Sequence, residues 1–145
     1  MREVRRSALV PYTPGQMYSL VEDLERYPDF VPWVTEARVI ERGTDYVIGR
    51  LGMKKAGVRE VFTTRNTLRP PEEIQMDLVD GPFRVLSGQW IFENVADRGS
   101  KVDLRMCFEF SNPMLALLLS RTFEKSYTDL IDSFVARARA VYGRA

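Results

Sequence analysis

One long amphipathic segment near the C-terminal end most constrains how this chain can fold. From residue 113 onward, apolar residues recur every three or four positions: Phe123, Tyr127, Leu130, Phe134, Ala138 and Val141. Asn112 is a favourable helix cap, and Pro113 suits the first helical position. The spacing predicts a helix over residues 113–142 with a continuous apolar face. Because such a face must be buried, the rest of the chain has to supply a long second layer.

The region before this helix changes to a period of two, which is typical of strands. Strands are predicted at residues 2–10, 35–42, 45–52, 58–69, 73–80, 84–95 and 101–111. Turn residues such as Gly43-Thr44-Asp45 separate them, and short turns join antiparallel neighbours. We therefore expect an α+β fold of the order β-α-α-β-β-β-β-β-β-α. In this fold a curved seven-stranded antiparallel sheet wraps around the C-terminal helix.

The segment after the first strand is predicted to be helical and then irregular. Thr13 and Gln16 have the spacing of a capping box, and Pro14 occupies the first helical position. This helix must end before Pro28. Residues 27–33 contain two prolines, which favours a short helical turn or an ordered apolar loop.

Composition excludes several kinds of chemistry. The 145 residues contain no histidine and one cysteine, Cys107, so we expect no histidine-dependent triad, no metal site and no internal disulfide. We assign no catalytic residue. Basic and acidic residues number 21 and 20, a balance without a signature for DNA. No apolar run approaches the about 18 residues of a membrane span, and we expect one domain over residues 1–145.

Several local segments resemble a known family. They are Leu9-Val10-Pro11-Tyr12, Tyr27-Pro28-Asp29-Phe30-Val31-Pro32-Trp33, Gly81-Pro82-Phe83, Trp90-Ile91-Phe92, Phe134-Val135 and Val141-Tyr142-Gly143. Together they resemble the coenzyme Q-binding START-domain proteins, whose bacterial members are often labelled ribosome association toxins. The resemblance covers nearly the whole chain and implies the helix-grip fold of the START-like, or polyketide-cyclase-like, superfamily. That superfamily hosts carriers, cyclases and regulators, so the fold alone does not give the function.

The resemblance implies non-enzymatic binding of a hydrophobic ligand, with ubiquinone or a related polyprenyl lipid the leading candidate. A carrier or chaperone role in respiratory quinone function follows from it, with no cofactor required and ubiquinone as the expected bound ligand. One alternative is a toxin that binds the large ribosomal subunit and blocks subunit joining. Another is an enzyme of the cyclase or hydrolase type. The chain starts at its first strand without a transit peptide. That start favours a bacterial cytoplasmic protein, with a peripheral position at the inner membrane as an option.

Aromatic residues are the candidates for a cavity wall. Tyr27, Phe30 and Trp33 are spaced by three, so on a helical turn they project to one side, where prolines stiffen the backbone. Such rings suit the stacking of a flat quinone, although the same rings would also plug the end of a plain core. The predicted ligand-binding set is Tyr27, Phe30, Trp33, Phe83, Trp90, Leu118 and Phe123.

The start of the last helix is more apolar than one packing face requires. Residues 114–119 are all apolar, and a helix of this kind cannot bury every side chain against one surface. The candidates for contact with a membrane surface or a partner chain are Met114, Leu115, Leu119 and Arg121. Burial beneath residues 27–33 is the alternative.

Charge is unevenly distributed between two neighbouring predicted strands. Residues 54–69 are mostly basic, whereas residues 72–80 are acidic, a pattern that favours cross-strand pairing. The alternative is a basic patch for ribosomal RNA phosphate. Lys54, Lys55 and Arg59 are the candidate RNA contacts.

Overall fold

The computed structural model describes residues 1–143. The elements follow in the order β1 (Arg2–Val10), α1 (Pro14–Glu22), the 3-10 helix η1 (Leu24–Asp29), β2 (Val34–Arg42), β3 (Tyr46–Lys55), β4 (Val58–Arg69), β5 (Glu73–Asp80), β6 (Phe83–Asn94), the 3-10 helix η2 (Ala96–Arg98), β7 (Ser100–Phe110) and α2 (Pro113–Tyr142). This order confirms the predicted α+β class. Most predicted strand ends lie within one residue of the observed ends, because turn residues mark them locally. The exception is β3, which extends three residues beyond its predicted end at residue 52.

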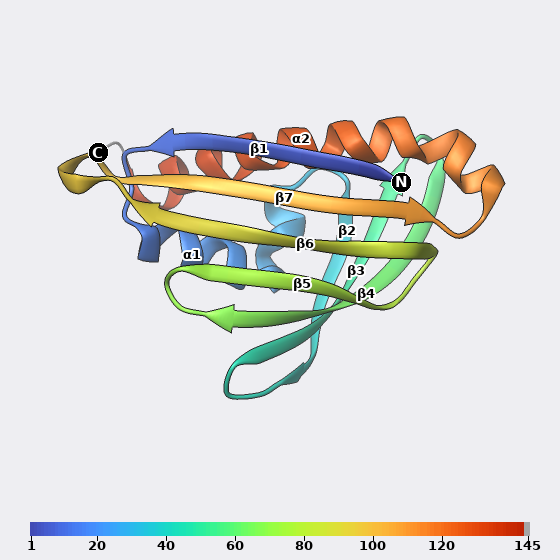
Figure 1. Ribbon diagram of the computed structural model, residues 1–145, viewed down its shortest axis with the longest axis horizontal. Coiled ribbons are helices and arrows are strands. Elements are labelled where there is room, and N and C mark those ends of the chain that lie inside the picture. The colour runs from blue at the N-terminus through green and yellow to red at the C-terminus, as the bar shows by residue number, and fades with distance from the viewer. Residues whose placement is uncertain (144–145) are drawn as a thin grey trace.

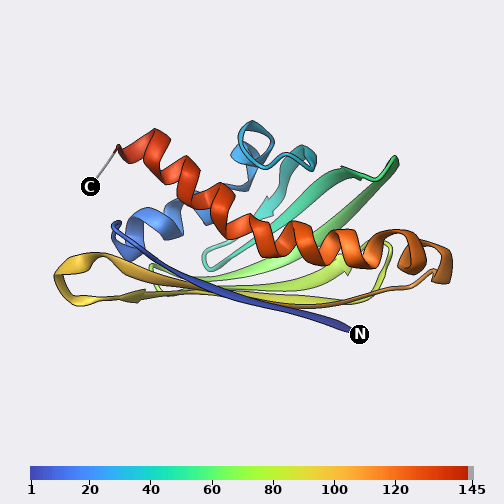
Figure 2. The same cartoon turned by 90° about the horizontal axis from the view of Figure 1, so that it is seen from above.

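The strands form one curved antiparallel sheet. Its seven strands lie in the order β1-β7-β6-β5-β4-β3-β2. Figure 1 shows that β2 and β3 run steeply across the direction of β1, β7 and β6, and that β4 bends from the one direction to the other. Seen from above, α2 crosses the hollow side of this bent sheet, and α1 and η1 lie on the same side (Figure 2). The fold therefore encloses a volume between the sheet and its helices.

Local capping sets where the helices begin. Thr13 Oγ1 accepts a hydrogen bond from the backbone N–H of Gln16 at 3.1 Å, and Gln16 Oε1 accepts one from the N–H of Thr13 at 2.9 Å. This confirms the predicted capping box. The side chain of Asn112 accepts from an N–H in the first turn of α2 at 2.7 Å. Helix α1 ends at Glu22, and η1 then carries the chain through Pro28.

The predicted stripe of α2 faces the sheet and forms the core with it. Phe123 lies against Phe108 with ring centroids 4.7 Å apart, and Phe134 lies against Trp90 at 5.2 Å. Val141, the last residue of the predicted stripe, is instead 50% exposed, because the final turn of α2 rises away from the sheet (Figure 2). None of the helices in residues 1–143 is long and apolar enough to cross a membrane.

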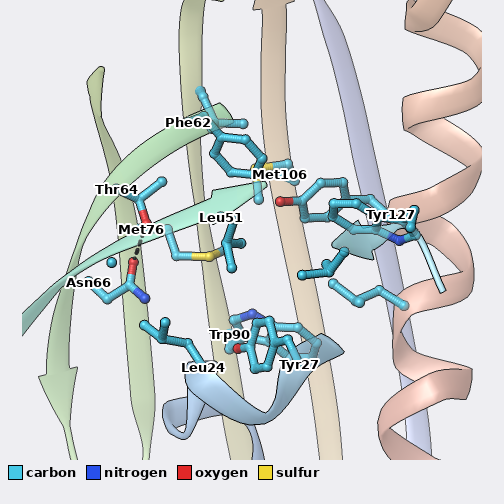
Figure 3. A pocket seen from close by; sticks show the side chains of 15 residues that line it. Leu24, Tyr27, Leu51, Phe62, Thr64, Asn66, Met76, Trp90, Met106 and Tyr127 are labelled. Carbon is cyan, nitrogen blue, oxygen red and sulfur yellow. Dashed lines mark hydrogen bonds between the residues drawn. The ribbon is translucent and has the colours of Figure 1, made fainter. Parts of the chain in front are cut away.

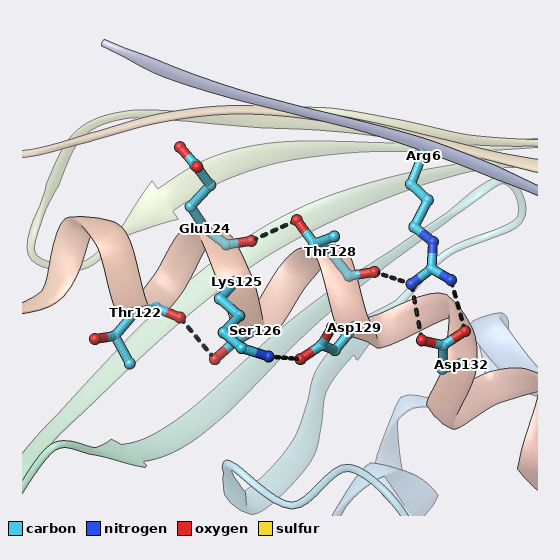
Figure 4. A network of polar contacts seen from close by, with 8 residues as sticks. All are labelled: Arg6, Thr122, Glu124, Lys125, Ser126, Thr128, Asp129 and Asp132. Carbon is cyan, nitrogen blue, oxygen red and sulfur yellow. Dashed lines mark hydrogen bonds and ion pairs between the residues drawn. The ribbon is translucent and has the colours of Figure 1, made fainter.

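An ion pair holds α2 beside the edge strand β1. Arg6 donates to both carboxylate oxygens of Asp132, at 2.7 and 2.9 Å, and also to the backbone carbonyl of Thr128 (Figure 4). The hydrogen bonds from Arg6 hold the pKa of Asp132 below its ordinary value. Because Asp132 is largely exposed, the pair contributes at most about 1 kcal/mol to stability. It links α2 to β1 at Thr128 and Asp132.

Candidate functional site

An apolar cavity lies between α2, η1 and the hollow side of the sheet (Figure 3). Leu24 and Tyr27 come from η1, Trp90 and Met106 from β6 and β7, and Tyr127 from α2. The space open to the centre of a water molecule is about 40 Å³. One water needs about 10–15 Å³ on that measure, so the cavity holds only a few waters. A ring-sized ligand therefore enters only if wall side chains move apart.

The cavity wall carries few polar groups and no charge. Among the described residues, no aspartate, glutamate, lysine or arginine lines it. The Tyr27 hydroxyl donates to the backbone carbonyl of Val21, and Thr64 donates to Asn66 Oδ1 at 2.9 Å. Burial raises the pKa of Tyr27 and of Tyr127, so both phenols are protonated at neutral pH. The wall can enclose a neutral apolar body and form a few hydrogen bonds with it.

Three of the predicted ligand-binding residues lie in this wall. Trp33 follows η1 and packs against Tyr127 with ring centroids 5.5 Å apart. Trp90 lines the cavity from β6, and Tyr27 lines it from η1. Phe30 does not line it, although it follows Tyr27 by one helical turn. Its ring lies against Phe134 at 5.1 Å and beneath the Arg137 guanidinium.

The other three predicted residues lie elsewhere, which corrects the predicted set. Phe83 and Phe123 are buried in an aromatic cluster with Phe110, at ring distances of 4.7 to 5.6 Å, and they do not line the cavity. Leu118 is 52% exposed and cannot line it. Because 3.6 residues make a helical turn, the buried Leu119 shares a face with Phe123, and Leu118 is turned outward.

The start of α2 divides between the core and the surface. Leu119 is fully buried, so its predicted contact with a membrane or partner is wrong. Leu115 is half-buried against the core, whereas Met114 and Arg121 are exposed. The most exposed apolar side chain of this turn, Leu117, was absent from the predicted set.

Sequence reasoning also missed the polar residues of the cavity. Thr64 and Asn66 lie on the inward face of β4, between the apolar Phe62 and Leu68. Polar residues at inward strand positions break the expected alternation, and that break was the available signal. The apolar stripe of α2 predicts Tyr127 as a core residue. Nothing in the sequence around it indicates that its phenol oxygen faces a cavity.

Basic side chains gather on the outer face of β2, β3 and β4. Arg38 lies opposite Arg50 in the β2–β3 register, and Lys54 lies opposite Arg59 in the β3–β4 register. All four are exposed, and none forms an ion pair within residues 1–143. We call these four residues the basic face. Lys55, the remaining predicted RNA contact, is half-buried and points to the other side of β3.

Further along β4, basic residues face acidic ones. Arg65 lies opposite Asp77, and Arg69 lies opposite Glu73, in the β4–β5 register. These pairs have the cross-strand arrangement that the charge pattern predicted. Cross-strand pairing therefore accounts for the later basic residues of β4. The basic face has no acidic residue directly opposite it on a neighbouring strand, and Glu36, on the same side of the sheet, lies opposite Gly52.

The sequence matches one protein family over most of its length. The match covers residues 10–135, and the family is described as "Polyketide cyclase / dehydrase and lipid transport". The chain belongs to this family. Membership confirms the predicted START-like resemblance, in which an antiparallel sheet wraps around a C-terminal helix.

Two relatives of similar length share more than a third of the aligned sequence, and a longer relative shares about a quarter. The ribosome association toxin RatA of Vibrio cholerae is 40% identical over 99% of each chain. The protein of the same name in Escherichia coli K12 is 37% identical over 98% of this chain and 90% of its own. The mitochondrial coenzyme Q-binding protein of Drosophila melanogaster is more distant, 27% identical over 92% of this chain and 57% of its own.

Solved structures show the same fold. The Zhui aromatase/cyclase from a Streptomyces species has a TM-score of 0.87 and 21% identity, over 99% of this chain and 96% of its own. An 18 kDa protein from Caulobacter crescentus has a TM-score of 0.79 and 30% identity, over 99% of this chain and all of its own. The chain is thus similar in fold to a protein named as an enzyme, and in sequence to proteins named as toxins and as a quinone-binding protein.

Proposed function

We propose that this protein binds a hydrophobic ligand, ubiquinone or a related polyprenyl lipid, in the cavity between α2 and the sheet. The observation that carries the proposal is an internal cavity lined by aromatic and aliphatic side chains without a charged group. The family description, which names lipid transport, and the name of the Drosophila relative support the same ligand class. The protein then acts as a carrier or chaperone in respiratory quinone function.

The proposal includes no chemical change in the ligand. General acid–base catalysis needs a titratable group within reach of the substrate, and the described cavity wall holds no carboxylate and only phenols of raised pKa. The solved aromatase/cyclase shares the fold at 21% identity, which carries no activity over to this chain.

Entry of the ligand requires the wall to open. Met76 and Met106 line the cavity, and methionine side chains adapt readily to a new shape. Leu24 of η1 packs directly over Gly49 of β3. A β-carbon at Gly49 would lie only 2.5 Å from the Cδ2 atom of Leu24. Movement of η1 away from Gly49 is therefore the simplest way to widen the cavity.

Intrinsic fluorescence tests the proposal directly. The chain has two tryptophans, Trp33 and Trp90, and both line the cavity. Titration with a short-tailed ubiquinone is expected to quench their emission to saturation at one equivalent. Leu51→Phe adds bulk inside the cavity and is expected to weaken binding at least tenfold. Leu118→Phe makes the same change on the exposed face of α2 and is the matched control.

Two outcomes contradict the proposal. One is an emission that does not saturate with added quinone. The other is equal quenching of the parent and Leu51→Phe, both shown by circular dichroism to be folded. Extraction of the freshly purified protein with organic solvent, followed by mass spectrometry, identifies any lipid that the protein retains from the cell.

A second candidate function is association with the large ribosomal subunit. Two observations favour it: relatives 37% and 40% identical over nearly their whole length carry the name ribosome association toxin, and the basic face is free of ion pairs within residues 1–143. We propose that in this case Arg38, Arg50, Lys54 and Arg59 contact RNA phosphate. Subunit joining would then be blocked by the bound protein.

Salt dependence distinguishes the two candidates. Binding to phosphate releases counterions, so affinity for purified large subunits should fall steeply with salt, whereas quinone binding should change little. The double variant Lys54→Ala with Arg59→Ala should reduce the slope of log K against log salt by about 1.5. Arg98→Ala with Lys101→Ala removes two exposed charges elsewhere as the control. Equal slopes for the two double variants would exclude the basic face.

A further inference from the structure

The hydroxyl of Tyr127 faces the cavity without a protein partner among the described residues. Tyr127 is 4% exposed, and its hydroxyl forms no hydrogen bond with another residue in the range 1–143. Its ring is held on α2 between Phe123, at 4.9 Å, and Trp33, at 5.5 Å. Figure 3 shows the ring reaching from α2 into the cavity with its oxygen toward the sheet. This hydroxyl is therefore free to donate a hydrogen bond to a ligand in the cavity.

A second donor faces the cavity from the sheet. Asn66 on β4 lines the wall, and its Oδ1 atom already accepts the hydrogen bond from Thr64. Its amide N–H groups are therefore left to donate. Tyr127 comes from the helix side and Asn66 from the sheet side, and Figure 3 shows them on opposite sides of the space.

The two groups set limits on the ligand. Burial keeps the phenol of Tyr127 protonated, so both groups offer hydrogen to an acceptor. A carboxylate ligand, such as a fatty acid, would be buried without a cation, because no lysine or arginine of the described chain lines the wall. A plain hydrocarbon would leave both donors without an acceptor, which disfavours its binding.

We infer that Tyr127 and Asn66 select a neutral, flat ligand that carries a carbonyl oxygen at each of two opposite ends, with one donor for each oxygen. This inference rests on the proposed ligand binding and adds the two residues that determine its specificity. Trp33 and Trp90 supply apolar surface for the body of the ring, and the donors orient it. An oxidised quinone ring has this arrangement of acceptors.

Matched probes separate orientation from burial. The probes are a benzoquinone and a benzene ring that carry the same geranyl tail, titrated by tryptophan fluorescence quenching and by calorimetry. The parent is expected to bind the quinone more tightly than the hydrocarbon. Tyr127→Phe and Asn66→Leu should each weaken quinone binding about fivefold to tenfold. Both variants should bind the hydrocarbon at least as tightly as the parent does, because each lacks a donor that the hydrocarbon leaves unpaired.

A stability measurement shows that the effect belongs to the ligand. Tyr127→Phe removes a hydroxyl that has no partner in the free protein, so its Tm should equal or exceed that of the parent. Infrared spectra should show the carbonyl band of bound quinone at higher frequency in Tyr127→Phe, because that oxygen loses its donor. Equal quinone affinity in the parent and both variants would overturn the inference. Binding of neither probe by the parent would overturn the proposed function, and the inference with it.

Discussion

Single positions without a side chain shape the sheet. Gly88 lies on β6 opposite Met106 of β7. A β-carbon at Gly88 would lie 2.4 Å from the backbone carbonyl oxygen of Arg105 and 3.0 Å from Met106 Sδ. Glycine inside a strand often marks such a close approach, and the two strands here come nearer than any larger residue allows. The same two strands, β6 and β7, supply Trp90 and Met106 to the cavity wall.

Gly88→Ala should therefore destabilise the protein. The new methyl group meets backbone, which cannot rotate away, so the strands must separate. We expect the free energy of unfolding to fall by about 1–3 kcal/mol, measured from urea unfolding midpoints. Ser87→Ala, at the neighbouring position, is the control and should change the free energy by less than about 0.5 kcal/mol. An alanine variant at position 88 as stable as the control would show that the strands can part without cost.

At the scale of elements, the sequence predicted what depends on local pattern. Strand alternation, the capping box at Thr13 and the cap at Asn112 are read within a few residues, and the structure confirms them. The cavity wall was predicted only in part, because it depends on where η1, the sheet and α2 meet. Phe30 and Phe123 are aromatic like Trp33, yet they pack against Phe134 and Phe108 and do not line the cavity. Composition marks such residues as core, but it does not say which part of the core is hollow.

In the first turns of α2, too, the apolar run alone does not say which side chains are buried, and mutation can test the assignment. Leu119 is fully buried, whereas Leu117 is 82% exposed, although both belong to one unbroken apolar run. Leu119→Ala should lower the free energy of unfolding by about 2–5 kcal/mol, because it leaves a cavity in the core. Leu117→Ala should change it by less than about 0.5 kcal/mol. Thermal and urea unfolding of the two variants measure the difference, and similar losses would contradict the assigned helix face.

At the scale of the whole molecule, the two candidate functions use opposite sides of one sheet. Leu51 and Phe62 point into the cavity, and Lys54 and Arg59 belong to the basic face on the outer side. The alternation of strands separates these surfaces by a single layer of backbone. Ligand binding and ribosome association are therefore separable by mutation, and a single protein can carry both.

The small cavity makes a kinetic prediction for the whole fold. With about 40 Å³ of free space, the closed form cannot admit a quinone ring, so opening must precede binding. When a minor open state is the one that binds, the observed rate levels off at the opening rate as ligand concentration rises. Stopped-flow quenching of Trp33 and Trp90 by a short-tailed ubiquinone should show this plateau.

Gly49→Ala provides the variant that tests which part opens. The added methyl group would lie 2.5 Å from Leu24 Cδ2 and should push η1 away from the sheet. We expect Gly49→Ala to raise the plateau rate, because η1 has already moved part of the way. Gly52→Ala is the control: its new methyl group would meet Glu36 on the outer face and should leave the plateau rate unchanged. A rate that climbs linearly to the highest ligand concentration would show that the cavity is open in solution. A plateau unaffected by Gly49→Ala would place the gate elsewhere than at η1.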